Sequence, residues 1–128
     1  MNRDTSGFTL LELLIVMVIM GILVLISIPR FTGARDKAYR AQMQTDLRTL
    51  VTAEEAYYDD NQTYTTQVNL LDYNKNPNVT INVLEANGSG YSAEATHLNT
   101  SAICGFYMGS VTPPASVTVT EGIIDCTP

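Results

Sequence analysis

A run of mostly apolar residues extends from Phe8 to Ile28, and Glu12 is the only charged residue in it. Thr9 and Ser27 are its only other polar side chains. About 20 mostly apolar residues suffice for a helix that crosses a bilayer. We therefore expect a membrane-spanning helix over residues 8–29. A carboxylate inside such a span is costly, so Glu12 marks a functional site that requires a partner.

The apolar pattern continues at helical spacing beyond this run, to about Tyr58. Pro29 lacks a backbone N–H and clashes with the preceding turn, so it is expected to kink the helix. After Pro29 the apolar residues fall on one stripe, which is suited to covering a sheet. The larger members of this stripe are Met43, Leu47, Leu50, Val51, Tyr57 and Tyr58.

The second half of the chain shows the two-residue alternation of strands. Residues 78–84 and 91–97 alternate apolar and polar positions around a turn at 87–90, which predicts a hairpin. Residues 103–108 predict a third strand, and 117–119 are a candidate fourth. The predicted fold class is α+β, with a long kinked N-terminal helix packed on a three- to four-stranded antiparallel sheet.

Charge is unevenly distributed along this chain of net charge −6. The cations gather just after the apolar run, and beyond Arg48 the only one is Lys75. This basic neck consists of Arg30, Arg35, Lys37, Arg40 and Arg48. The acidic head that follows offers no basic surface for phosphates, so we expect no direct contact with nucleic acid.

The two cysteines, Cys104 and Cys126, form no CxxC motif and have no histidine close by, which makes a redox or zinc site a poor interpretation. In an exported protein the pair predicts one disulfide that closes a C-terminal loop.

The sequence predicts neither catalysis nor a metal or cofactor site. His97 is the only histidine and is interpreted as a surface or edge residue at the end of a strand. Glu54, Glu55, Asp59 and Asp60 are interpreted as a solvated helix end, without the spacing of an EF-hand.

The residues around the start of the apolar run carry a family resemblance. Gly7 is followed by Phe-Thr-Leu-Leu-Glu-Leu-Leu-Ile-Val, and Gly21 and Pro29 come later in the run. This pattern closely resembles the class III signal of type IV pilins and pseudopilins. Residues 45–64 are similar to the helix end of short bacterial major pilins.

The resemblance implies a pilin fold and a set of processing and assembly residues. Residues 1–7 would be a leader, which a prepilin peptidase removes by cutting between Gly7 and Phe8 before N-methylating Phe8. Glu12 would meet the new Phe8 amine of a neighbouring subunit during assembly. Residues 30–128 would form the head.

The implied function is that of a structural subunit of a type IV pilus, used for adhesion, motility or DNA uptake. Its partners would be identical subunits in a helical filament, the prepilin peptidase, an inner-membrane assembly platform and, before assembly, membrane lipid. The chain would move from the bacterial inner membrane to the cell surface. A pseudopilin or minor pilin of a type II secretion or competence system is the alternative, and a monomeric membrane-anchored binding protein is a third. The basic neck would be a solvated face, a contact for lipid headgroups or a surface that pairs with acidic residues of a neighbour.

Overall fold

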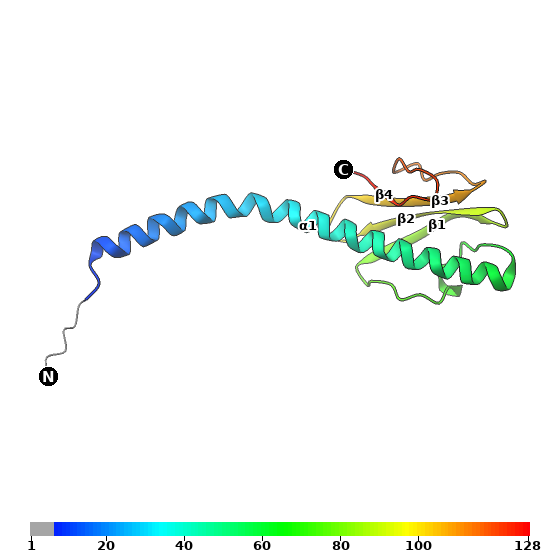
Figure 1. The fold of residues 1–128 in the computed structure, drawn as a ribbon, viewed down its shortest axis with the longest axis horizontal. Coiled ribbons are helices and arrows are strands. Elements are labelled where there is room, and N and C mark those ends of the chain that lie inside the picture. Colours follow the sequence, from blue (N-terminus) through cyan, green and yellow to red (C-terminus); the bar gives the residue numbers. More distant parts are fainter. Residues whose placement is uncertain (1–6) are drawn as a thin grey trace, which may run out of the picture. The chain divides into compact units, whose positions relative to one another are not determined.

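The computed structural model describes residues 7–128, except for the side chains of Ile28, Pro29, Arg30 and Thr32. The element order is α1, η1 and then four strands, β1 to β4 (Figure 1). The chain divides into two compact units, Met1–Arg35 and Asp36–Pro128. Apart from Gly7, the predicted leader lies outside the described residues.

Helix α1 spans Leu10–Asn61, 52 residues. It ends three residues later than the sequence pattern predicts, where Gln62 adopts a left-handed backbone with φ of 57°. The Gln62 N–H donates to the Tyr58 carbonyl at 2.8 Å, which satisfies one of the free carbonyls of the last turn. Helical backbone continues through Pro29, and the kink there stays a prediction.

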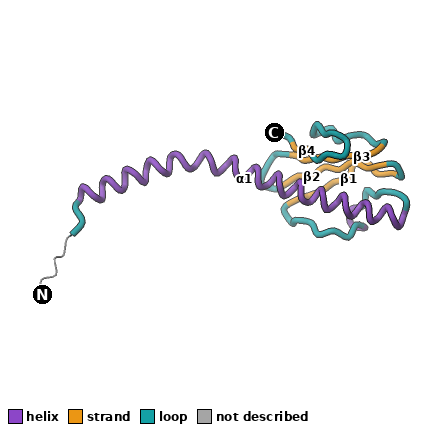
Figure 2. Tube along the Cα trace, in the orientation of Figure 1, coloured by secondary structure: helices purple, strands orange, loops and turns teal. Residues whose placement is uncertain are grey.

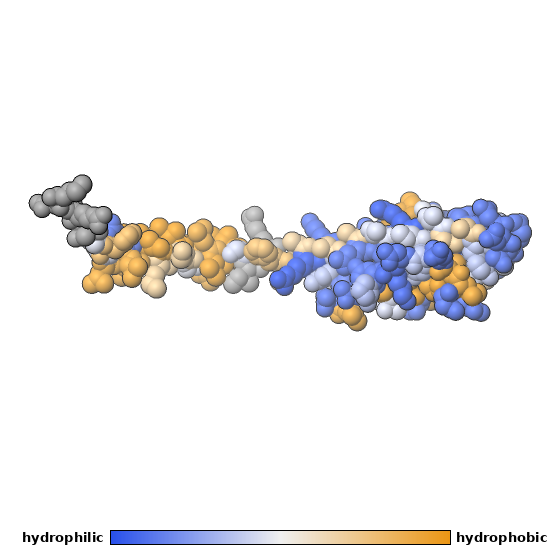
Figure 3. All heavy atoms as spheres, turned by 90° about the horizontal axis from the view of Figure 1, so that it is seen from below, coloured by the Kyte–Doolittle hydropathy of each residue, from blue (hydrophilic) through white to orange (hydrophobic). Residues whose placement is uncertain are grey.

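In the first unit the apolar side chains of α1 are uncovered. Residues Leu10–Ser27 are long and apolar enough to cross a membrane, and none of them is buried inside the protein. Figure 3 shows this segment as a hydrophobic surface, whereas the face of the second unit seen there is largely hydrophilic. Such a helix needs lipid or other protein around it.

The second unit contains one antiparallel sheet with the strand order β1-β2-β3-β4. Its strands are β1 (Val79–Asn87), β2 (Gly90–His97), β3 (Ile103–Gly109) and β4 (Asp125–Cys126). Figure 2 shows the later part of α1 lying along this sheet, with loops on both sides. A short 3-10 helix, η1 (Val68–Leu70), lies in the connection between α1 and β1. The predicted hairpin is confirmed as β1 and β2.

The core of the second unit lies between α1 and one face of the sheet. The helix contributes Met43, Leu47 and Leu50, all fully buried. The sheet contributes alternate residues of its strands, as the two-residue period requires. These are Val79, Ile81, Ala93, Ala95 and Cys104. The small alanines of β2 let the larger helix side chains approach the middle of the sheet.

The candidate fourth strand at residues 117–119 was wrong, and β4 takes that place. Cys126 pairs in register with Cys104 of β3, and the two are joined by a disulfide across 22 residues. Val117 and Val119 instead direct their side chains over Gly105, where an added Cβ would meet both. The intervening segment therefore packs through side chains and contributes no strand to the sheet.

Two glycines at the β1–β2 turn, Gly88 and Gly90, differ in the space available for a side chain. A Cβ on Gly90 would collide with the backbone carbonyl of Met108 in β3, whereas a Cβ on Gly88 would make only an ordinary contact with the Gln62 carbonyl at 3.6 Å. Gly90→Ala should therefore lower the free energy of unfolding by about 1–3 kcal/mol. Gly88→Ala should change it by less than about 0.5 kcal/mol. Thermal unfolding of the full-length protein in detergent measures both, and equal melting temperatures for the two variants would contradict this account.

Candidate functional site

Glu12 is held at the start of α1 by its own chain. Gly7, Phe8 and Thr9 precede the helix, and Thr9 is its N-terminal cap. The Thr9 backbone N–H and hydroxyl donate to Glu12 Oε2 at 2.9 and 3.0 Å. In return the Glu12 backbone N–H donates to Thr9 Oγ1 at 3.2 Å. These reciprocal bonds form a capping box, which satisfies two backbone donors that a helix start leaves free.

The capping role of Thr9 was missed at the sequence level. The signal was present, because a threonine followed three residues later by a glutamate, ahead of an apolar run, is typical of a capping box. The structure thus gives Glu12 a partner within its own chain. Both hydrogen bonds from Thr9 use the same carboxylate oxygen, Oε2.

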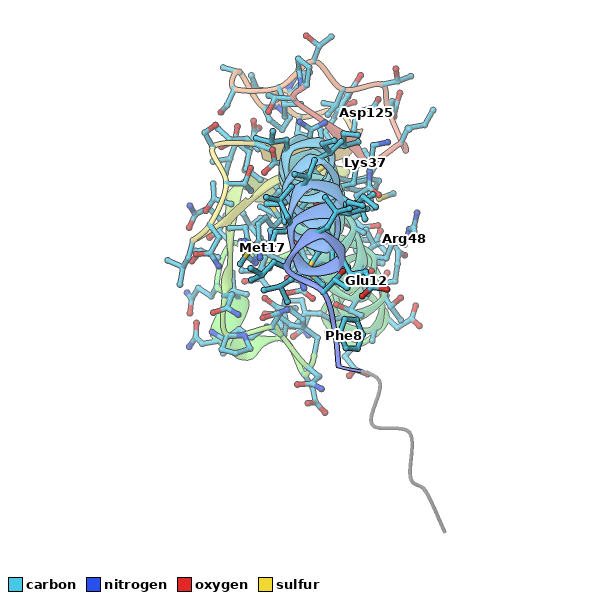
Figure 4. The ribbon with its side chains drawn as sticks, turned by 90° about the vertical axis from the view of Figure 1, so that its left-hand side faces the viewer. Phe8, Glu12, Met17, Lys37, Arg48 and Asp125 are labelled. Carbon is cyan, nitrogen blue, oxygen red and sulfur yellow. A yellow bond between two sulfur atoms is a disulfide. The ribbon has the colours of Figure 1, made fainter. Side chains whose placement is uncertain are left out.

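The surroundings of this carboxylate are apolar and exposed. Phe8 is 86% exposed and Leu10 is 89% exposed. Figure 4 shows Glu12 and Met17 directed to different sides of α1. A carboxylate set in such a surface attracts a cation most strongly once lipid or protein excludes water from it. Glu12 thus lies in the first turn of α1, on an apolar surface and four residues after Phe8.

The prediction that Glu54 belongs to a solvated helix end is wrong. Its side chain is fully buried, although Glu55, Asp59 and Asp60 are exposed. The Thr65 backbone N–H donates to Glu54 Oε2 at 3.1 Å, because the chain folds back over α1 after its last turn. Glu54 Oε1 and the Tyr91 hydroxyl are buried without a partner among the described residues.

Burial is the largest influence on the ionisation of this carboxyl, and it raises the pKa of Glu54 above its ordinary value. The Thr65 N–H opposes the rise, and the neighbouring Glu55 charge adds to it. Burial also raises the pKa of Tyr64 to about 12, with help from its hydrogen bond to Glu55. Tyr64 stacks on Tyr58 with ring centroids 4.7 Å apart. The Tyr64 ring also lies 4.8 Å, centroid to centroid, from that of Tyr91 in β2.

His97 was also misassigned, because it is only 5% exposed. Its Nδ1 accepts from the Asn99 N–H at 3.1 Å, so in the neutral ring the proton is on Nε2, which donates to Gln42 Oε1 at 3.0 Å. The ring stacks on Tyr39 with centroids 4.5 Å apart. Both nitrogens and one face of the ring are thus engaged, which gives His97 a structural role between α1 and the end of β2.

The described part of the chain contains no group of three or more histidine, cysteine or acidic residues that could hold a metal ion. The two cysteines are joined in the disulfide predicted from the sequence. It ties β4 to β3 and thereby closes the C-terminal loop.

Comparison with known proteins identifies a family match and several relatives of this chain. Residues 2–28 match the family described as prokaryotic N-terminal methylation motif. The type IV wide pilus major component PilA4 of Thermus thermophilus is 34% identical over 99 residues, which cover 74% of this chain and 76% of that protein. Its similarity therefore includes much of the second unit.

Other relatives are similar over a shorter segment. The type II secretion system core protein G of Klebsiella michiganensis is 42% identical over 65 residues, 51% of this chain and 46% of that protein. The type IV major pilin protein PilA of Myxococcus xanthus is 33% identical over 72 residues, 56% of this chain and 33% of that protein. The chain thus spans less than half the length of these two relatives.

The buried Glu54 carboxyl should make stability depend on pH. A carboxyl whose pKa is raised by folding binds its proton more tightly in the folded state, so its contribution to stability falls as pH rises from about 4 through the folded pKa. Glu54→Gln keeps an acceptor for Thr65 without a charge. Its melting temperature relative to wild type should therefore increase between pH 4 and pH 7. Asp72→Asn, at an exposed position, is the control. If the melting temperature of Glu54→Gln differs from that of wild type by the same amount at every pH, Glu54 does not cause the pH dependence.

Proposed function

Because the chain belongs to the family of type IV pilins and pseudopilins, we propose that it is a structural subunit of a type IV pilus, polymerised through its N-terminal helix into a surface filament. The observation that carries the proposal is the uncovered apolar surface of α1 with Glu12 at its start. Lipid covers this surface before assembly, and the helices of identical subunits cover it afterwards.

Processing is proposed to occur between Gly7 and Phe8, through a prepilin peptidase that then N-methylates Phe8. The position of the helix start supports this, because α1 begins only at Leu10 and the bond to be cut lies in non-helical chain. Its two chain neighbours aside, none of the residues between Gly7 and Pro128 has an atom within 4 Å of the site where a Cβ on Gly7 would be, which supports access by an enzyme. The cut leaves an amine on Phe8 next to the helix cap.

Glu12 is proposed to have two roles. In its own chain it caps α1 through Thr9, and in the filament it pairs with the Phe8 amine of a neighbouring subunit. The first role supports the second, because the cap fixes the carboxylate at the helix start before a partner arrives. Pairing offsets the cost of enclosing the charge in an apolar environment, and an unpaired neighbour in the wrong register would leave that cost in place.

The chain is proposed to reside in the bacterial inner membrane before it joins the filament. An assembly platform in that membrane would then add it to the growing fibre. The basic residues after the apolar run would remain outside the hydrocarbon. This account assigns the chain a structural and not a catalytic role, and it requires no cofactor.

A pseudopilin of a type II secretion system is the second candidate. The 42% identity to the secretion protein of Klebsiella michiganensis favours it, whereas the longer match to the pilus component of Thermus thermophilus favours the pilus. A monomeric anchored binding protein is a weaker third candidate, since it leaves the position of Glu12 unexplained.

Deletion of the gene separates these candidates. If the chain is the pilus subunit, surface filaments seen by electron microscopy disappear and return when the gene is restored. Filaments that persist while protein secretion or DNA uptake is lost would favour a pseudopilin or minor pilin instead. Anchored monomers in place of any assembly would support the third candidate.

Substitutions at Glu12 test its role in assembly. Glu12→Ala and Glu12→Gln should both be cut after Gly7, as seen by intact mass, yet give far fewer filaments than wild type. Gln retains an acceptor for Thr9 and loses only the charge, so its failure would identify the charge as the essential feature.

Thr9→Val is the matched control, because it removes the hydroxyl of the cap and keeps the Glu12 carboxylate. Loss of an N-cap side chain costs about 1 kcal/mol of helix stability, and filaments should still form. Normal filament yield from Glu12→Gln would sink the pairing with the Phe8 amine.

A further inference from the structure

One exposed face of α1 in the second unit carries cations first and anions later. Lys37, Arg48, Glu55 and Asp59 are all exposed. At 3.6 residues per turn, the directions of these four side chains around the helix axis differ by at most about 40°. Figure 4 shows Lys37 and Arg48 on the same side of α1. The buried stripe of Met43, Leu47 and Leu50 lies on another face of the helix.

Arg48 is exposed, and no acidic residue lies three or four positions from it in α1, where an ion pair along the helix would form. Glu55 is the next acid on the same face, two turns further along α1. That separation is about 10 Å along the axis, beyond the range of a direct ion pair. Arg48 and Glu55 of one chain are thus too far apart to pair with each other.

A hollow of about 370 Å³ adjoins Arg48. Its lining comes from α1, β3 and the C-terminal loop, and consists of Arg48, Val51, Phe106, Gly122, Ile123 and Ile124. Ile123 is 52% exposed, although it is a large apolar residue. Apolar walls with an arginine among them are typical of the central part of a protein interface.

The later part of the same helix face offers a complementary shape and charge. Glu55 is flanked on the surface by Thr52 and Ala56, whose small side chains allow close approach. The Tyr64 hydroxyl donates to Glu55 Oε1 at 3.1 Å and so restrains the carboxylate. This turn of α1 is a convex, acidic surface of the kind that the hollow beside Arg48 can receive.

We propose that the hollow and Arg48 of one copy of the chain bind the Glu55 turn of α1 from a second copy. The proposal rests on the proposed filament, in which identical subunits supply this partner. A second copy is favoured over another acidic protein because the complementary turn is present on every copy of the chain. The contact is heterologous, so repeating it extends an assembly and does not close a dimer.

The direction of this contact agrees with that proposed for Glu12. Phe8 precedes Glu12 by four residues, and Arg48 precedes Glu55 by seven. In both pairs the cation comes first along the chain. Within the second unit, a parallel neighbour displaced by seven residues toward the C-terminal end, about 10 Å, brings its Arg48 level with Glu55.

Charge reversal tests the pairing in full-length chains expressed in cells. Arg48→Glu and Glu55→Arg should each reduce the yield of sheared filaments by about tenfold or more, because each places like charges opposite one another. The double variant restores opposite charges and should recover most of the wild-type yield.

Matched variants separate the pairing from general effects of charge. Lys75→Glu makes the same change of charge as Arg48→Glu, at a cation outside α1. Asp60→Arg makes the same change of charge as Glu55→Arg, on another side of the helix. Both should assemble as wild type does.

The outcomes distinguish this pairing from the function on which it rests. If both Arg48→Glu and Glu55→Arg give the wild-type yield of filaments, the pairing is overturned but the proposed function is not. The charged face of α1 is then only a solvated surface. If Arg48→Glu loses its filaments and the double variant does not recover them, the pairing is also overturned. In that case, weaker binding of Arg48→Glu to vesicles of anionic lipid would indicate that Arg48 contacts lipid headgroups. A wild-type chain that forms no filaments overturns the proposed function together with the pairing.

Discussion

The apolar surface of α1 between Leu10 and Ile26 is the constraint on which the rest of the molecule depends. Its large side chains are between 46% and 89% exposed in the single chain. Each square ångström of apolar surface left in water costs about 25 cal/mol, so this helix requires a cover that the chain itself does not supply. Lipid and neighbouring helices both meet that requirement. The capped Glu12 adds a charge that lipid alone does not satisfy.

The second unit shows how the same helix behaves once protein covers one face. Met43, Leu47 and Leu50 are buried against the small residues of β2, and the opposite face carries charges. The disulfide between Cys104 and Cys126 fixes the short β4 at the edge of the sheet. The head therefore has its own core, and α1 connects that core to a segment that is stable only in lipid or in an assembly.

Local patterns in the sequence predicted most of this fold. The alternation in β1 and β2 and the helical stripe of α1 follow from side-chain periods of 2 and 3.6 residues, which can be read without a structure. The Thr9–Glu12 cap could also have been read from its spacing and was overlooked.

The errors concern residues whose environment depends on distant parts of the chain. Glu54 is buried because Thr65 returns over the helix end, and β4 replaces the candidate strand at 117–119 because the disulfide sets its register. His97 is buried through Gln42 and Tyr39, which are more than 50 residues away in the sequence. The central claim, that cleavage after Gly7 prepares α1 for assembly, is tested most directly by intact-mass and N-terminal mass spectrometry of the main subunit in sheared filaments. The account predicts a chain that begins with N-methylated Phe8, and filaments built from a chain that still begins before Gly7 would contradict it.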